Sequence, residues 1–146
     1  MAVYNYDPKD VVVICGGIVI SGYADGSMVK LARDADAYAK FVGTDGETSR
    51  VRSRNKSGSL TITLAQTSPS NDALSVFAML DETSNAGVFP VLVKDNSGRS
   101  VFASAAGWVK KLPDSEFGKE VASREWFIDL ADLNMLVGGN ATAGVI

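Results

Sequence analysis

The feature that most constrains this sequence is a strictly alternating segment, residues 59–67, that leads directly into a helix start signal. Large aliphatic side chains occupy every second position: Leu60, Ile62 and Leu64. Because successive side chains of a strand point to opposite faces, this pattern predicts a strand with one buried face. The opposite face, which carries Thr61 and Thr63, is small, polar and uncharged. Such a face suits a hydrated surface that does not bind tightly to a molecule passing over it.

A helix is predicted to begin directly after this strand. Ser68 is a favourable N-cap, Pro69 suits the first helical position, and Asp72 complements the positive end of the helix dipole. The following residues predict a broad apolar helix face, formed by Ala73, Leu74, Val76, Phe77, Ala78 and Leu80. The sequence Asn85-Ala86-Gly87 marks the end of the helical region.

The rest of the chain has the pattern of strands and turns. Strands are predicted at residues 11–14, 18–22, 28–33, 37–42, 48–56, 88–94, 99–111 and 121–130. Asp-Gly pairs at 25–26 and 45–46 are strong hairpin signals. In the last strand, Trp126, Ile128 and Leu130 share one face, and Trp108 is also expected in the core.

Eight or nine strands and one crossing helix predict a mainly β fold, a two-sheet antiparallel sandwich or barrel. We expect one domain over residues 1–146, with an N-terminal arm at 1–9, a long hairpin and a flexible C-terminal tail at 138–146. Exposed strand edges and terminal arms are typical of a subunit that pairs with neighbouring copies.

The composition excludes several classes of function. Histidine is absent and Cys15 is the single cysteine, which removes Ser-His-Asp and Cys-His nucleophiles and the usual zinc sites. Asp34 and Asp36 fit a turn better than a metal site. No apolar run approaches the roughly 18 residues of a membrane helix, and the net charge of -3 is not that of a nucleic-acid binder. We therefore predict a protein with no enzymatic activity, cofactor or membrane span.

The segment from Thr44 to Lys56 is predicted to be an assembly element. Cations recur at every second position: Arg50, Arg52, Arg54 and Lys56. Neither face of this strand is convincingly apolar, so burial within one subunit would leave the cations without partners. The preferred interpretation is a contact between subunits or stacked rings that also includes Asp45, with carboxylates such as Asp114, Glu116 or Glu120 as partners. A solvated hairpin and a DNA groove are the alternatives, and the groove lacks interleaved aromatic residues.

An ordered set of stretches between Tyr6 and Gly138 resembles the phage tail tube proteins, specifically short-chain tube subunits of contractile-tailed, myovirus-like phages. These stretches are Asp10-Val11, Gly43 to Glu47, Ser57-Gly58, Leu64 to Asn71, Leu74-Ser75, Lys111 to Asp114 and Glu125 to Asp129. Leu-Ala-Gln-Thr-Ser-Pro-Ser-Asn, at residues 64–71, is the most specific of them.

The resemblance implies subunits that form hexameric rings, stacked into a tube whose channel conducts the phage genome. Thr61 and Thr63 are expected to face this channel, through which DNA passes without specific binding. The implied partners are other copies of the chain, the tail sheath, and baseplate or terminator proteins. The implied location is the virion tail, after synthesis in the host cytoplasm. A reducing cytoplasm also suits Cys15, which follows the apolar run 11–14 and is expected to be a buried, reduced thiol.

Two alternatives remain at this stage. A secretion-system tube or a baseplate ring component would use the same fold. A small-ligand-binding β-barrel would need an enclosed apolar cavity, whereas Thr61 and Thr63 suggest an open polar face.

Overall fold

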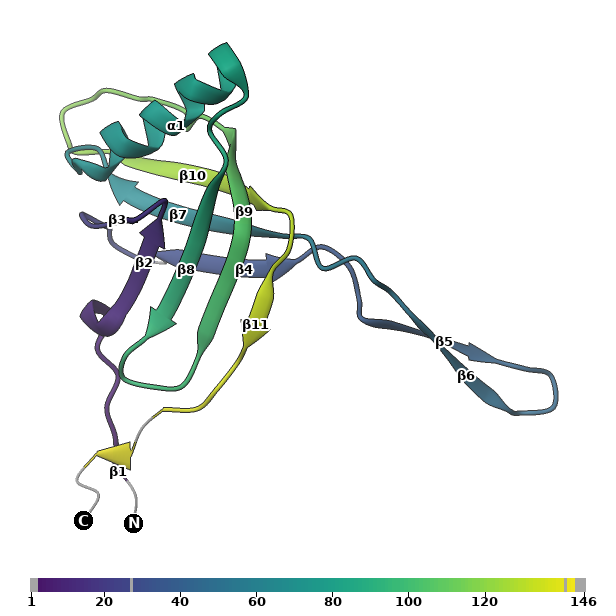
Figure 1. Ribbon diagram of the computed structural model, residues 1–146. Helices are drawn as coiled ribbons and strands as arrows, with labels where there is room; N and C mark the ends of the chain where they lie inside the picture. The colour runs from purple at the N-terminus through teal and green to yellow at the C-terminus, as the bar shows by residue number, and fades with distance from the viewer. Residues whose placement is uncertain (1–2, 27, 141, 144–146) are drawn as a thin grey trace.

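Antiparallel strands in two crossing layers enclose the core in a computed structural model that describes residues 3–26, 28–140 and 142–143 (Figure 1). The elements are β1 Val3–Tyr4, a 3-10 turn Pro8–Asp10, β2 Val11–Cys15, β3 Ile18–Val19, β4 Val29–Arg33, β5 Tyr38–Val42, β6 Thr48–Arg52, β7 Gly58–Ala65, α1 Ser70–Ser84, β8 Phe89–Asp95, β9 Val101–Lys111, β10 Ser123–Leu130, β11 Asn134–Leu136 and β12 Thr142–Ala143. The predicted mainly β fold with one flanking α-helix is confirmed.

The main sheet has the strand order β3-β2-β8-β9-β10-β7-β4, and β11 pairs with β9. Strands β2 and β8 form one layer and strands β10, β7 and β4 form the other, while the long strand β9 belongs to both (Figure 1). The sheet therefore curls on itself, and α1 lies across one end of it (Figure 1).

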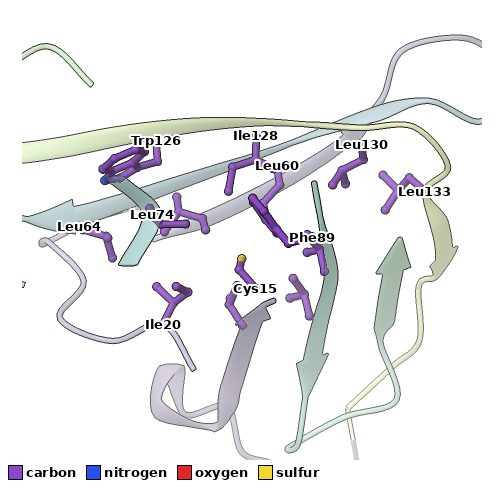
Figure 2. Packing of buried hydrophobic residues seen from close by; sticks show 14 residues of the cluster. Cys15, Ile20, Leu60, Leu64, Leu74, Phe89, Trp126, Ile128, Leu130 and Leu133 are labelled. Atoms are coloured by element: carbon purple, nitrogen blue, oxygen red, sulfur yellow. The ribbon is translucent and has the colours of Figure 1, made fainter. Parts of the chain in front are cut away.

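The core lies between the two layers and confirms both predicted strand patterns. Leu60, Ile62 and Leu64 of β7 are fully buried, and Trp126, Ile128 and Leu130 of the paired strand β10 are at most 1% exposed. Leu74 of α1 belongs to the same cluster, and Phe89 and Cys15 enter it from β8 and β2 (Figure 2). The expectation of a buried thiol at Cys15 is confirmed.

The predicted helix is confirmed, but it starts one residue later than expected: α1 begins at Ser70, with Pro69 in the N-cap position. The hydroxyl of Ser68 accepts a hydrogen bond from the Ser70 amide at 3.2 Å. At the other end Asn85 adopts a left-handed conformation with φ 55°. Its amide donates to the Asp81 carbonyl, so the predicted end of the helix is also confirmed.

The buried face of α1 is narrower than the sequence predicts. Leu74 and Ala78 are buried and Phe77 packs against the core, but Val76 is 54% and Leu80 40% exposed. The helix covers one end of a curled sheet, so only a narrow stripe of its side chains reaches the core.

Trp108 is the clear error in the predicted core. It is only partly buried and pairs with Asp129, which lies on the side of β10 opposite Trp126. The β8–β9 pairing shifts register between Phe89 and Val91, which reverses the inward side of β9. An uninterrupted alternation along β9 would have placed Trp108 inside.

The two terminal arms pair with each other in the described part of the chain. Strand β1 forms an antiparallel pair with β12 in which Val3 lies opposite Ala143 and Tyr4 opposite Thr142. The amide of Asn140 also donates to the carbonyl of Asn5. Residues 141 and 144–146 of the predicted flexible tail lie outside the described residues.

Candidate assembly surfaces

The predicted hairpin is present and projects from the body of the molecule (Figure 1). Strands β5 and β6 form a separate two-stranded sheet, with pairs running from Tyr38 opposite Arg52 to Val42 opposite Thr48. All ten residues of the two strands are exposed. The predicted turn at Asp45-Gly46 closes the hairpin, and Gly46 has the positive φ of 89° that favours glycine.

The base of the hairpin is held by hydrogen bonds to the turn after β10. The Leu133 amide donates to the Lys56 carbonyl at 2.8 Å, and the Arg33 guanidinium donates to the Leu133 carbonyl at 2.8 and 3.1 Å. Asp34 lies in the turn between β4 and β5, where one carboxylate oxygen accepts from the Ser57 hydroxyl at 3.0 Å. The sheet therefore fixes where the hairpin emerges.

One face of the hairpin is cationic. Because residues directly opposite each other in an antiparallel pair share a face, Lys40, Arg50 and Arg52 lie together beside Tyr38. The Arg50 guanidinium carbon is 4.3 Å from the centre of the Tyr38 ring, a cation–π contact. Arg54 and Lys56 lie beyond the end of β6, so the expected single strand face with four cations is wrong.

The other face of the hairpin is apolar, which corrects the expectation that neither face is. The register places Val51 opposite Ala39 and Ser49 opposite Phe41, all four on this face. Phe41 is 64% and Val51 60% exposed. The apolar residues Ala39 and Phe41 belong to β5, and they share a face with Val51 only because β5 pairs with β6. The exposed apolar face of this hairpin is a surface that contact with another protein chain would bury.

The loop between β9 and β10, residues 112–122, lies at the opposite end of the sheet from the hairpin (Figure 1). The hairpin connects to β7 at Gly58, which pairs with Leu130, whereas the loop leads into Ser123, which pairs with Ala65 at the far end of β7. The loop carries the predicted partner carboxylates Asp114, Glu116 and Glu120, all of them exposed. It also exposes apolar side chains: Leu112, Phe117 and Val121.

Arg124 is a functional candidate that the sequence analysis missed. Its side chain is 6% exposed and donates to the carbonyls of Ser123 at 3.1 Å and Glu116 at 3.2 Å. The Phe117 ring lies over the guanidinium, with its centre 5.1 Å away. No carboxylate of the described residues lies within ion-pair distance of it. The alternation with Trp126 was the available signal, because it places Arg124 on the inward face of β10.

Arg124 lines a surface pocket of about 410 Å³ between the loop and the start of α1. Its walls include Gln66, Asn71, Leu112, Phe117 and Trp126. The Gln66 side chain accepts from the Ala122 amide at 3.1 Å and the Gln66 amide donates to the Ala122 carbonyl at 2.9 Å. These bonds fix the end of the loop against β7.

Thr61 and Thr63 lie on the sheet face opposite the core, as the alternation predicts. Both are partly buried, while their neighbours along β7 are fully buried. Across the strands, Thr61 pairs with Phe127 and Lys30, and Thr63 pairs with Glu125. The face is therefore small and polar along β7 but carries charged and aromatic side chains on both sides.

The described residues contain no helix that is long and apolar enough to cross a membrane. The fold defines the class of mainly β structural domains with exposed association surfaces: a projecting amphipathic hairpin at one end, and at the other a loop that carries carboxylates and exposed apolar side chains.

The chain belongs to the Bacteriophage PhiTE tail tube protein family, whose model matches residues 1–138. It is 32% identical over 144 residues to "Structural protein ORF10" of Pseudomonas phage KPP10, covering 93% of this chain and 83% of that protein. The family assignment identifies a structural component of the phage tail in the virion.

Solved structures share the fold at low sequence identity. The cap that terminates the tube of the anti-feeding prophage aligns with a TM-score of 0.65 and 9% identity over 97% of this chain and 95% of that one. A chain of the PVC sheath-tube complex, an extracellular contractile injection system, aligns with a TM-score of 0.63 and 12% identity over 91% and 92%. A chain from a native gene transfer agent virion aligns with a TM-score of 0.61 and 12% identity over 91% and 100%.

Proposed function

We propose that this protein is the repeating tail tube subunit, that it forms stacked hexameric rings, and that the channel conducts the phage genome without catalysis. The observation that carries this proposal is that the two ends of one subunit present different surfaces. An exposed amphipathic hairpin leaves one end of β7, and the acidic loop lies at the other end. Different surfaces at opposite ends support a head-to-tail contact, which repeats into an open filament instead of closing into a dimer.

Within a ring, we propose that neighbouring subunits continue the main sheet. Strands β3 and β4 are its two edges, so one side of each presents main-chain N–H and C=O groups to a neighbour. Such edges are templates for pairing with another chain. Ring closure through edge pairing would satisfy these groups and give a continuous wall.

The channel face in this proposal is the outer surface of β7. Thr61 and Thr63 carry no charge that would hold a phosphate, and their hydroxyls keep the surface wet. DNA would therefore pass without specific binding. The charged neighbours on this face are Lys30, Glu125 and Asp129; they include both signs, so the face does not have a single strong potential.

Between rings, we propose that the hairpin contacts a neighbouring copy through residues of its tip, stem and base: Asp45, Arg50, Arg52, Arg54 and Lys56. The support is that the stem cations have no carboxylate partner in their own subunit among the described residues. Tail sheath and baseplate or terminator proteins are the further partners that this role requires. The solved relatives from a sheath-tube complex and a tube-terminating cap support this choice of partners.

Negative-stain electron microscopy of the purified protein tests this function. We expect rings or tubes, whose symmetry gives the number of subunits. A monodisperse monomer over a wide range of concentration and salt, without rings, would exclude the tube role. That outcome would leave a monomeric binding domain as the interpretation.

A further inference from the structure

The buried guanidinium of Arg124 lacks a counterion within its own subunit. Its two hydrogen bonds to main-chain carbonyls leave three of the five guanidinium N–H groups without a hydrogen-bond partner among the described residues. A buried charge without an opposite charge is costly, and an incoming carboxylate would supply both the charge and the missing acceptors. The guanidinium lines an open surface pocket, so a carboxylate from another chain can approach it.

Four of the eight other residues that line the pocket are apolar or aromatic, namely Leu112, Pro113, Phe117 and Trp126. Leu112 and Phe117 stand at its rim, 44% and 78% exposed, and Trp126 lies at its floor. Its volume of about 410 Å³ is enough for one large side chain together with a carboxylate. The pocket therefore fits a segment that offers an exposed carboxylate next to an exposed apolar side chain.

The tip of the hairpin offers this combination. The Asp45 carboxylate accepts a hydrogen bond from the Glu47 amide at 3.2 Å, so it is used within the turn. The carboxylate of Glu47 is exposed and has no hydrogen bond or ion pair among residues 3–26, 28–140 and 142–143. Phe41, next to the turn, is 64% exposed.

We propose that the pocket beside Arg124 is the socket for the hairpin tip of a second copy, with Glu47 paired to Arg124 and Phe41 packed against Phe117 and Leu112. This inference rests on the proposed stacking and names the surface that receives the hairpin. The hairpin and the pocket lie at opposite ends of β7, so each subunit fills one socket and offers another. The stem cations Arg50 and Arg52 then come near the carboxylates of the same loop, which are distributed along residues 114–120.

Charge reversal at the tip is the first test. Glu47→Arg places a cation against Arg124, and we expect at least about a tenfold rise in the protein concentration needed for tubes, because a desolvated charge pair becomes repulsive. Glu82→Arg, on the exposed side of α1, makes the same change in net charge and is the matched control. It should assemble as the wild type does. Wild-type assembly by Glu47→Arg would overturn the socket.

Disulfide trapping is the second test, and it does not depend on weakening assembly. Thr44→Cys combined with Ser115→Cys places one thiol on the tip and one on the pocket wall and leaves Glu47 and Arg124 in place, while the native Cys15 is fully buried. Oxidised assemblies should give a ladder of dimers, trimers and longer chains on a non-reducing gel. Each single-cysteine variant should give at most dimers. Assemblies of the double variant without a ladder would exclude the socket and leave the tube role intact, whereas a wild-type protein without assemblies would reject both.

Discussion

The indole N–H of Trp126 donates a 2.8 Å hydrogen bond to Oδ1 of Asn71, which ties β10 to the first turn of α1. The Nδ2 group of Asn71 donates in turn to the Ala65 carbonyl at 3.0 Å. One amide side chain therefore links the helix to the paired strands β10 and β7. Trp126 and Asn71 also line the pocket beside Arg124, so the same bond shapes that surface.

Asn71→Ala should destabilise the fold measurably. The Trp126 side chain is 1% exposed, and an unpaired buried N–H costs about 1–3 kcal/mol. We expect the free energy of unfolding, measured by chemical denaturation, to fall by about that amount. Asp72→Ala, one residue along, removes only an exposed carboxylate near the helix start and should cost less than about 1 kcal/mol. Equal losses in the two variants would contradict a structural role for the Asn71 bond.

The two faces of β7 should respond differently to charge. Ile62 is fully buried, so Ile62→Asp places an unpaired charge in the core at a cost of several kcal/mol. We expect this variant to be unfolded or to melt far below the wild type. Thr61→Lys lies on the opposite, partly exposed face and should keep the wild-type melting temperature while it adds one cation per subunit to the proposed channel. A harmless Ile62→Asp would reverse the assignment of the faces.

Alkaline pH should destabilise the subunit through its core. Burial raises the pKa of Cys15 to about 12, and burial together with the nearby Cys15 raises the pKa of Tyr23 to about 12. Both groups are neutral below their pKa, so the folded state binds their protons more tightly than the unfolded state. This contribution to stability is fully present below about pH 9, the ordinary pKa of the thiol, and is lost as the pH rises toward 12.

The measurement is the free energy of unfolding between pH 8 and 11, which should fall steadily as the pH rises. Cys15→Ala removes one of the two groups and leaves a small cavity, so it should be less stable at pH 8 but lose less between pH 8 and 11. Tyr23→Phe should be close to neutral at pH 8, because the buried Tyr23 hydroxyl has no hydrogen-bond partner among the described residues. Stability that does not change over this range would argue against burial of both groups.

Local sequence patterns were sufficient wherever one strand face or one helix cap decides the structure. The alternation around Ile62, the hydrogen bond from the Ser70 amide to Ser68 at the helix start, and the turn at Asp45-Gly46 are all of this kind. The predictions failed where the position of a residue depends on its pairing with another strand. The register shift in β9 turned Trp108 outward, and the apolar hairpin face exists only because β5 pairs with β6.

The candidate site shows the same division. The cations at Arg50 and Arg52 and the carboxylates from Asp114 to Glu120 were recognisable as charge patterns. The buried state of Arg124 depends on the loop that folds over it, and the pairing of β1 with β12 joins the two ends of the described chain. Contacts of such long sequence separation leave no periodic signal in either segment.

Reversing the stem cations should block tube growth without unfolding the subunit. Arg50 and Arg52 lie on an exposed hairpin that pairs only with itself, so Arg50→Glu combined with Arg52→Glu removes no core contact. Exposed ion pairs contribute only about 0–1 kcal/mol each, but a ring repeats the contact in every subunit. We expect an almost unchanged melting temperature and no tubes by electron microscopy. Lys9→Glu with Arg99→Glu, two exposed cations elsewhere, makes the same change in net charge and should still assemble.

Hydrogen exchange gives an independent measure of the same contact. An isolated two-stranded hairpin is marginally stable in water, so the amides from Thr44 to Lys56 should exchange rapidly in the dissociated subunit. In tubes the neighbouring copy should cover the hairpin and slow the exchange of the same amides. The amides of β7, which has partners on both sides, should be protected in both states and serve as the internal reference. If the hairpin amides exchange equally in both states, or the double variant forms normal tubes, the hairpin is a solvated loop and takes no part in assembly.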